Sequence, residues 1–237
     1  MQGASKTCLA ACLALFISAC GGGHDPFAPP PANYNLQAGM AEMVSKGLSA
    51  NVSLSGTAII GGVSTAFTGS GTFTRPPAVS VTFNSTLALA QTTTVAGSVT
   101  VAGQTAPYST SDTDYYAGSD SAFLGEVSAS EYDVAQAPIM FPTTVMGGSS
   151  GTLGTLSRYT DSSMSVSLGT AQVAYSTLAP IDPGSPIAIM VTTTIYDTHD
   201  TLIETDVTTY SMTSSNVISL SGATAQNQSG TLKVTAQ

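Results

Sequence analysis

The sequence contains few basic residues and few residues that commonly act as nucleophiles or bases. Its 237 residues include five Lys and Arg together, two His, three Cys and no Trp. Fourteen Asp and Glu residues give a formal net charge of −9. A surface of this sign repels nucleic acid and anionic lipid headgroups, so we expect no nucleic-acid partner.

Sequence motifs of cofactor-dependent enzymes are also missing. The chain contains no phosphate-binding loop and no dinucleotide-binding glycine fingerprint. A Ser-His-Asp triad would have to use His199, because His24 lies in a segment rich in glycine and proline. We therefore expect no cofactor and no metal, and we predict that the protein is not an enzyme. The alternative is a hydrolase that uses an acidic pair or His199, since paired carboxylates meet in space rather than in sequence.

The most specific motif lies in the first twenty residues. Lys6 precedes an apolar run at residues 8–17, whose length suits a signal peptide and is about half of what a bilayer-spanning helix requires. The run leads into the sequence ISAC, in which a branched aliphatic residue and two small residues precede Cys20. This stretch resembles the signal peptide and lipobox of bacterial lipoproteins at all four positions.

The resemblance implies that residues 1–19 are a signal peptide and that Cys20 is the lipidation site and the first mature residue. A diacylglycerol on the side chain and a further chain such as palmitate on the amino group would together anchor the protein. Gly21 stands at the second mature position, where lipoproteins retained in the inner membrane tend to carry Asp. The predicted location is the outer membrane of a Gram-negative cell envelope, with the membrane as a partner through the anchor. A protein or small-molecule partner is left open.

Residues 20–35 are predicted to form a tether, because three glycines and four prolines among small residues cannot pack a core. A helix is predicted at residues 36–46, where Leu36, Met40, Met43 and Val44 share one face. Asn35 can cap its start and Gly47 can end it.

From residue 51 onward the apolar residues alternate with polar ones, the period of strands that have one buried face. The clearest run is residues 79–89, where Val79, Val81, Phe83, Leu87 and Leu89 share one side. Reversals of the chain are predicted at Gly61-Gly62, Ala102-Gly103, Gly169-Thr170 and Asp197–Asp200.

These patterns predict an all-β fold for residues 36–237, with ten to twelve antiparallel strands and one short N-terminal helix. The expected architecture is a β-sandwich or a partly open barrel. Residues 111–142 lack a sustained period and are predicted to be a long excursion that joins two β subregions, 36–137 and 138–237.

Two places in the sequence could carry chemistry. Asp197, His199 and Asp200 could bind a metal, but they fall where a hairpin must turn, and we predict that His199 is exposed there. Asp112, Asp114 and Asp120 are a possible weak calcium site, because Asp112 and Asp114 are spaced like the first two ligands of a calcium-binding loop. The residues at the later ligand positions of such a loop are not suitable ligands. The function predicted from the sequence is a lipid-anchored envelope protein with a β-rich, non-catalytic binding or structural domain.

Overall fold

The structure, a computed structural model, describes residues 33–180, 182 and 185–237. The predicted signal peptide, Cys20, His24 and most of the tether lie outside these residues. The described residues contain one helix, α1 (Leu36–Lys46), followed by thirteen strands. The first seven strands are β1 (Leu48–Ile60), β2 (Val63–Arg75), β3 (Val79–Phe83), β4 (Thr86–Val101), β5 (Gln104–Ala117), β6 (Phe123–Val127) and β7 (Tyr132–Ile139). The other six are β8 (Ser150–Tyr159), β9 (Ser167–Leu178), β10 (Ile187–Tyr196), β11 (Leu202–Met212), β12 (Ile218–Asn227) and β13 (Gly230–Ala236).

Helix α1 has the bounds and the caps that the sequence predicts. The Asn35 side chain accepts a hydrogen bond from the Ala38 amide at 2.9 Å, and Gly47, at a φ of 79°, ends the helix. Its buried face includes Leu36, Met40 and Met43. Within the described part of the chain, no helix is long and apolar enough to cross a membrane.

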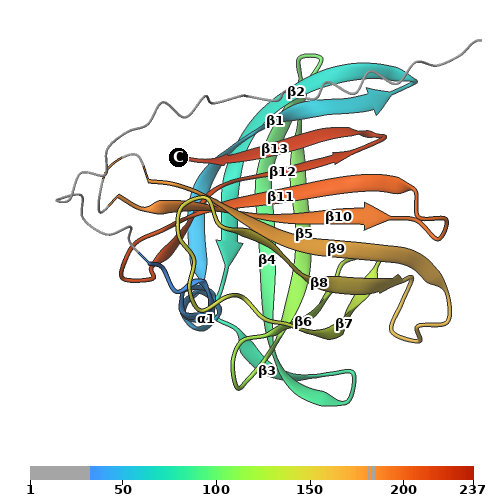
Figure 1. Ribbon diagram of the computed structural model, residues 1–237. Coiled ribbons are helices and arrows are strands. Elements are labelled where there is room, and N and C mark those ends of the chain that lie inside the picture. The colour runs from blue at the N-terminus through green and yellow to red at the C-terminus, as the bar shows by residue number, and fades with distance from the viewer. Residues whose placement is uncertain (1–32, 181, 183–184) are drawn as a thin grey trace, which may run out of the picture. The chain divides into compact units, whose positions relative to one another are not determined.

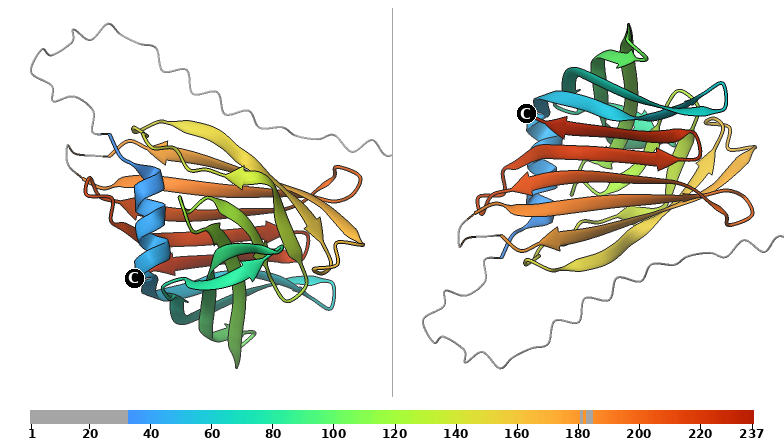
Figure 2. Two further views of the ribbon diagram at one scale, coloured as in Figure 1. Left: turned by 90° about the horizontal axis from the view of Figure 1, so that it is seen from below. Right: turned by 90° about the horizontal axis from the view of Figure 1, so that it is seen from above.

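The strands form one antiparallel sheet that closes on itself. Its order is β2-β1-β13-β12-β11-β10-β9-β8-β7-β6-β5-β4-β3, and an additional pairing of β2 with β4 completes a ring of twelve strands. Strand β3 pairs only with β4, at the margin of the ring. Figure 1 shows β9 to β13 side by side, with β4 and β5 at a steep angle to them. Figure 2 shows α1 running across one end of the strands.

The all-β antiparallel prediction is confirmed, with two corrections. Of the two predicted architectures, the sandwich is wrong and the barrel fits loosely, because the sheet is closed rather than partly open; it contains thirteen strands, twelve of them in the ring, rather than ten to twelve. The described residues form one compact unit, and the sheet runs through both of the predicted subregions.

Glycines make the closure of the barrel possible. Gly71 of β2 and Gly97 of β4 are paired directly across the seam. A Cβ atom on Gly97 would lie 2.1 Å from the Ser70 carbonyl oxygen and 2.6 Å from the Gly71 Cα. Larger residues would therefore force the two strands apart at the point where the ring closes.

Three predicted segments differ from the structure. Residues 79–89 are not one strand, because Asn84 and Ser85 have φ values of 47° and 62° and form a tight turn between β3 and β4. Gly169 lies inside β9 rather than in a turn, and a Cβ there would meet the Tyr196 carbonyl oxygen at 2.1 Å. The predicted excursion at residues 111–142 supplies the end of β5 and all of β6 and β7, so it is part of the barrel wall. The turns at Gly61-Gly62, Ala102-Gly103 and Asp197–Asp200 are confirmed.

The largest apolar core lies inside the barrel and is covered by α1. Leu36 and Met40 of the helix pack with inward-facing side chains of β1 and β10, such as Leu54 and Ile189. Ile189 is fully buried, and so is Met212 on β11. Burial of these side chains supplies most of the driving force for folding.

Candidate functional site

A row of polar side chains crosses five consecutive strands on the inner face of the barrel. The pairing registers place Gln91 opposite Asp114, Asp114 opposite Glu126, Glu126 opposite Asp133, and Asp133 opposite Arg158. We call these five residues the polar row. Side chains directly opposite one another in antiparallel strands lie about 4.5–5.5 Å apart at Cβ, and like charges at that distance repel. Glu126 therefore stands between two other carboxylates, with one arginine toward each end of the row.

Arg75 stabilises the first end of the row. This guanidinium, 6% exposed, pairs with the Asp114 carboxylate and donates to the Tyr116 hydroxyl. Its Nε also donates to Gln91 Oε1 at 2.7 Å. Asp114 is thus held by a buried, hydrogen-bonded ion pair.

Gln91 connects this end of the row to the helix. Its Nε2 group lies 3.0 Å from the carbonyl oxygen of Met43, 3.3 Å from that of Val44 and 2.9 Å from that of Pro76. The last carbonyls of a helix lack hydrogen-bond donors within the helix, and here the fully buried Gln91 side chain donates to them. The C-terminus of α1 is therefore fastened to the wall that carries the carboxylates.

The other end of the row is only partly satisfied. Arg158 pairs with Glu131 through Nη2, and its Nε lies 3.6 Å from Asp133 Oδ2, too far for a good hydrogen bond. Among the side chains of the described residues, four buried polar atoms have no hydrogen-bond partner: Arg158 Nε, Arg158 Nη1, Asp133 Oδ1 and Asp206 Oδ1. Arg158 is 3% exposed and Asp133 is 9% exposed. Such atoms cost about 1–3 kcal/mol each when they are left unpaired.

The opposite wall of the barrel contributes two more carboxylates. Glu204 and Asp206 lie on β11, on the same face as the buried Tyr210, and Asn227 donates to Glu204 at 3.3 Å. Strands β11 and β6 are five places apart in the sheet, yet Asp206 is close enough to Glu126 to repel it. Asp206 therefore adds to the repulsion on Glu126 from another wall of the barrel.

Seven acidic residues and both arginines of the sequence gather in this region. We call the seven the acidic cluster: Asp112, Asp114, Glu126, Glu131, Asp133, Glu204 and Asp206. They are half of the fourteen acidic residues in the chain. Arg75 and Arg158 each pair closely with one carboxylate, so the carboxyl groups of the cluster outnumber its cations.

Burial and mutual repulsion shift the protonation of these carboxyls. Burial, followed by repulsion from Asp114 and Asp112, raises the pKa of Glu126 well above its ordinary range. Burial raises the pKa of Asp133 to about 7, although the Arg158 guanidinium opposes the shift. Burial and the neighbouring Glu204 raise the pKa of Asp206 to about 7. Asp133 and Asp206 are therefore partly protonated near neutral pH and would release protons to a bound cation.

A polar hollow of about 460 Å³ reaches the cluster from the side of the barrel. It lies between β5 and the turn that joins β6 to β7, and it is lined by Ser109, Thr110, Ser111, Asp112, Ser128, Ala129 and Ser130. Asp112 belongs to both the hollow and the acidic cluster, and burial, followed by Asp114 and Glu131, raises its pKa. A small polar molecule could therefore approach the cluster between serine hydroxyls.

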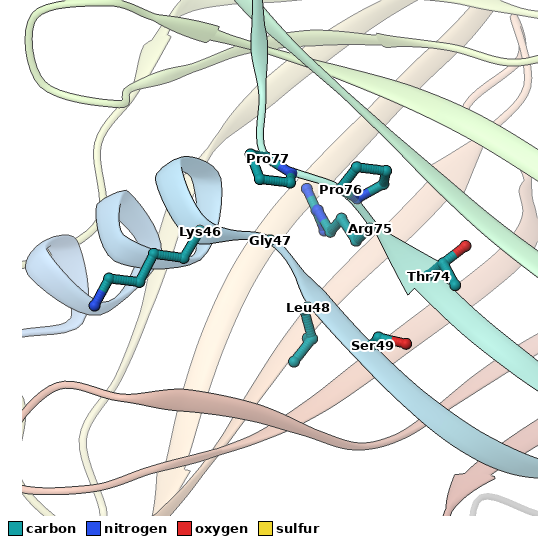
Figure 3. Close-up of a pocket in the computed structure, with 8 residues that line it drawn as sticks. All are labelled: Lys46, Gly47, Leu48, Ser49, Thr74, Arg75, Pro76 and Pro77. Carbon is teal, nitrogen blue, oxygen red and sulfur yellow. The ribbon is translucent and has the colours of Figure 1, made fainter.

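A second hollow, of about 310 Å³, lies where α1 meets β1 and β2 (Figure 3). Gly47, Leu48, Pro76 and Pro77 line it together with Ser49, Thr74 and Arg75, whose guanidinium is already bonded to Asp114 and Gln91; in Figure 3 the Lys46 side chain points away from the prolines. This lining offers little hydrogen-bonding chemistry compared with the acidic cluster. We therefore place the candidate site at the cluster and the hollow beside Asp112.

The structure separates the predicted calcium-loop residues. Asp112 and Asp114 lie within β5, whereas Asp120 is in the turn before β6, where its side chain accepts from the Ala122 amide at 3.0 Å. The three residues therefore do not form one loop. Among the described residues, no three His, Cys, Asp or Glu side chains converge as a metal site.

His199 lies at the exposed tip of the β10–β11 hairpin, as predicted. Its side chain is 84% exposed, and its Nδ1 is 3.9 Å from Asp197 Oδ2. Asp197 accepts hydrogen bonds from the amides of Thr201 and His199, which lower the pKa of its carboxyl and fix the turn. Turn formation accounts for these residues.

The sequence Gly147-Gly148-Ser149-Ser150-Gly151 has the spacing of a hydrolase nucleophile elbow, a pattern that sequence reasoning overlooked. An elbow requires a strand, a sharp turn and a helix, but this segment is a turn that leads into strand β8. The Ser149 hydroxyl accepts from the Met146 amide at 3.0 Å, so it supports that turn.

Sequence reasoning missed most of the site. It identified Asp112 and Asp114 for a different role, and it did not single out Glu126, Glu131, Asp133, Arg158, Glu204 or Asp206. One signal was available in the sequence. Only 8% of the residues are charged, yet three pairs of acidic residues are spaced two apart: Asp112 with Asp114, Glu131 with Asp133, and Glu204 with Asp206. That spacing places the members of each strand on one face.

Comparisons with known proteins give no family. No family model matches the chain, and no curated protein matches it. A domain from Vibrio parahaemolyticus, described as outer membrane lipoprotein-sorting, is 10% identical with a TM-score of 0.28, covering 86% of this chain and 90% of its own. A DUF1329 family protein from Desulfovibrio piger is 8% identical with a TM-score of 0.27, covering 86% of this chain and 92% of its own. At these values, function has to be argued from the site itself.

Proposed function

We propose that the protein is a lipid-anchored component of the bacterial outer membrane and that its barrel binds a small polar ligand at the acidic cluster without catalysing a reaction. The observation that carries the binding proposal is the grouping of seven carboxyls and two arginines in and beside the interior, with four buried polar atoms unpaired. A purely structural interior would be more stable with apolar side chains in these positions. Groups that are kept at a cost in stability are typical of binding sites.

The anchor is tested by the variant Cys20→Ala. Without the thiol no diacylglycerol can attach, so the variant should leave the membrane fraction in a carbonate wash and should not mature to the size of the wild-type protein. A variant that stays with the membrane and matures normally would rule out lipidation at Cys20.

The binding site is tested by the effect of Glu126→Gln on stability. The substitution keeps the shape of the side chain and removes the titratable carboxyl that lies between Asp114 and Asp133. We expect the free energy of unfolding at about pH 8 to rise by about 1 kcal/mol, because the native state no longer has to bury a carboxyl that ionises freely in the unfolded chain. Urea unfolding of the full chain in a non-ionic detergent measures it.

The matched control is Glu42→Gln, the same change on the exposed side of α1, where Glu42 pairs with Lys46. It should alter the free energy of unfolding by no more than about 0.5 kcal/mol. If Glu126→Gln instead lowers stability by more than about 1 kcal/mol, the charges form a stabilising structural network and the binding proposal fails.

A hydrolase that uses an acidic pair is the second candidate. One observation favours it: Glu126 and Asp133 are directly paired, and both have raised pKa values, as a general acid requires. A glycosidase would convert chromogenic glycosides and lose that activity in Glu126→Gln. No turnover by the wild-type protein would leave binding as the function.

A further inference from the structure

We infer that the ligand of the acidic cluster is a hydroxylated amine, a compact molecule that carries an ammonium group beside hydroxyl oxygens, as an amino sugar does. This inference rests on the proposed function, because it assigns a chemical class to the ligand of the same site. Its basis is the set of unpaired atoms that the cluster presents and the charge that surrounds them.

The unpaired atoms define what the ligand must offer. Asp133 Oδ1 and Asp206 Oδ1 are buried acceptors without donors, whereas Arg158 Nε and Nη1 are buried donors without acceptors. A ligand that satisfies all four must donate hydrogen bonds to two carboxylates and accept them from a guanidinium. An ammonium group supplies donors alone, and a hydroxyl group supplies both.

The charge of the cluster determines the charge of the ligand. Arg75 pairs with Asp114, and Arg158 pairs with Glu131 and lies 3.6 Å from Asp133, which leaves four of the seven carboxyls without an arginine nearby: Asp112, Glu126, Glu204 and Asp206. A carboxylate or phosphate on the ligand would be repelled by these groups, although Arg158 alone could bind it. An ammonium group lowers the repulsion between Glu126, Asp133 and Asp206, so the amine belongs on the carboxylate side.

The arrangement of the carboxyls suits an organic cation better than a metal ion. Glu126, Asp133 and Asp206 come from β6, β7 and β11, on both sides of the interior. Within the described residues, no three acidic, histidine or cysteine side chains converge as a metal site. Because the groups come from two walls of the interior, each can contact a different part of a ring-sized molecule.

The test uses three ring compounds of similar size at about pH 7: glucosamine, glucose and cyclohexylamine. Glucosamine has both the ammonium group and hydroxyls, glucose has only hydroxyls, and cyclohexylamine has only the ammonium group. Calorimetric titration of the full chain is done in a polyoxyethylene detergent, which contains no sugar. Glucosamine should bind at least about tenfold more tightly than either of the others.

Each titration is repeated in two buffers with different ionisation enthalpies. Because the carboxyls of the free site are partly protonated, docking of an ammonium group should release protons, so the measured heat of glucosamine binding should depend on the buffer. Binding of glucose should show no such dependence. Proton release separates an interaction with the cluster from binding of a sugar elsewhere on the surface.

Two variants of one hairpin provide the structural control. Asp206→Asn removes a cluster charge on β11 and should weaken glucosamine binding by about tenfold or more. Asp200→Asn removes a charge at the exposed tip of the same hairpin and should change the affinity by less than about twofold. Both replacements are close in shape to the native residue, so folding should be retained.

The possible outcomes distinguish this inference from the proposed function. If glucose binds as tightly as glucosamine, the ammonium requirement is wrong; if cyclohexylamine does, the hydroxyl requirement is wrong. If glucosamine does not bind at about 10 mM, the ligand class is wrong. In that case a Glu126→Gln variant that is more stable than the wild type would still support a polar ligand site. A variant that is less stable would contradict the proposed function as well.

Discussion

The interior of the barrel has two halves of opposite character. Beneath α1 it is apolar, with Leu36, Leu54, Ile189 and Met212 at most 1% exposed. Across β5 to β8 and β11 it carries the acidic cluster beside a smaller apolar cluster that includes Ile139 and Leu156, and the central Glu126 faces two carboxylates. The first half stabilises the fold, whereas the second half opposes it whenever its carboxyls ionise. One barrel therefore separates the residues that hold it together from those that we expect to hold a ligand.

The largest effect should come from the apolar half. Ile189→Ala removes a fully buried side chain from the core under α1 and leaves a cavity. We expect a loss of about 3 kcal/mol in the free energy of unfolding, measured with urea. In the acidic half, Glu126→Gln should instead raise the free energy of unfolding. Substitutions in the two halves are therefore expected to change stability in opposite directions.

The control for Ile189→Ala is Leu178→Ala, on the neighbouring strand, where the side chain is 56% exposed. It should cost no more than about 0.5 kcal/mol. A loss below about 1 kcal/mol for Ile189→Ala would mean that the core under α1 is not the main source of stability.

The smallest effect should come from the exposed hairpin tip. His199→Ala should change the free energy of unfolding by no more than about 0.5 kcal/mol, because the side chain is largely exposed and the turn is held by Asp197. Ligand binding should be unchanged as well. A marked loss of either property would place His199 in the functional machinery and revive the histidine-based hydrolase.

Local features of the fold could be predicted from the sequence because their signals are local. The helix at residues 36–46 has an amphipathic pattern and both caps, Asn35 and Gly47, within thirteen consecutive residues. The turns at Gly61-Gly62 and Ala102-Gly103 contain the glycines that positive φ angles favour. The turn at Asn84-Ser85 was missed because non-glycine residues adopt positive φ there and the flanking apolar residues kept their alternation.

Closure of the barrel and the site could not be predicted in this way. The seam between β2 and β4 depends on a register between segments separated by a whole hairpin. Residues 111–142 lack a regular apolar alternation because their inward positions include Asp112, Asp114, Glu126 and Asp133. A search for apolar alternation cannot detect a strand whose inner face is acidic. The inward-facing acidic residues that hid the strand pattern at residues 111–142 are therefore members of the candidate site.

The pH dependence of stability tests the central claim, that the acidic half of the interior destabilises the fold when it is ionised. The native pKa values of Asp133 and Asp206 are raised to about 7, from an ordinary value of 3.8. Between these values the native protein holds protons that the unfolded chain has released, so stability must fall as pH rises. Asp161 and Asp197, whose pKa values are lowered, change stability only below this window.

The measurement is the free energy of unfolding of the wild-type full chain by urea, at intervals from about pH 5 to about pH 8. We predict a decrease of at least about 2 kcal/mol across this range, with a smaller decrease in Asp206→Asn. A free energy of unfolding that stays constant or rises with pH would show that the buried carboxyls are stabilised as anions, and it would contradict the claim that ionisation of the acidic half opposes folding.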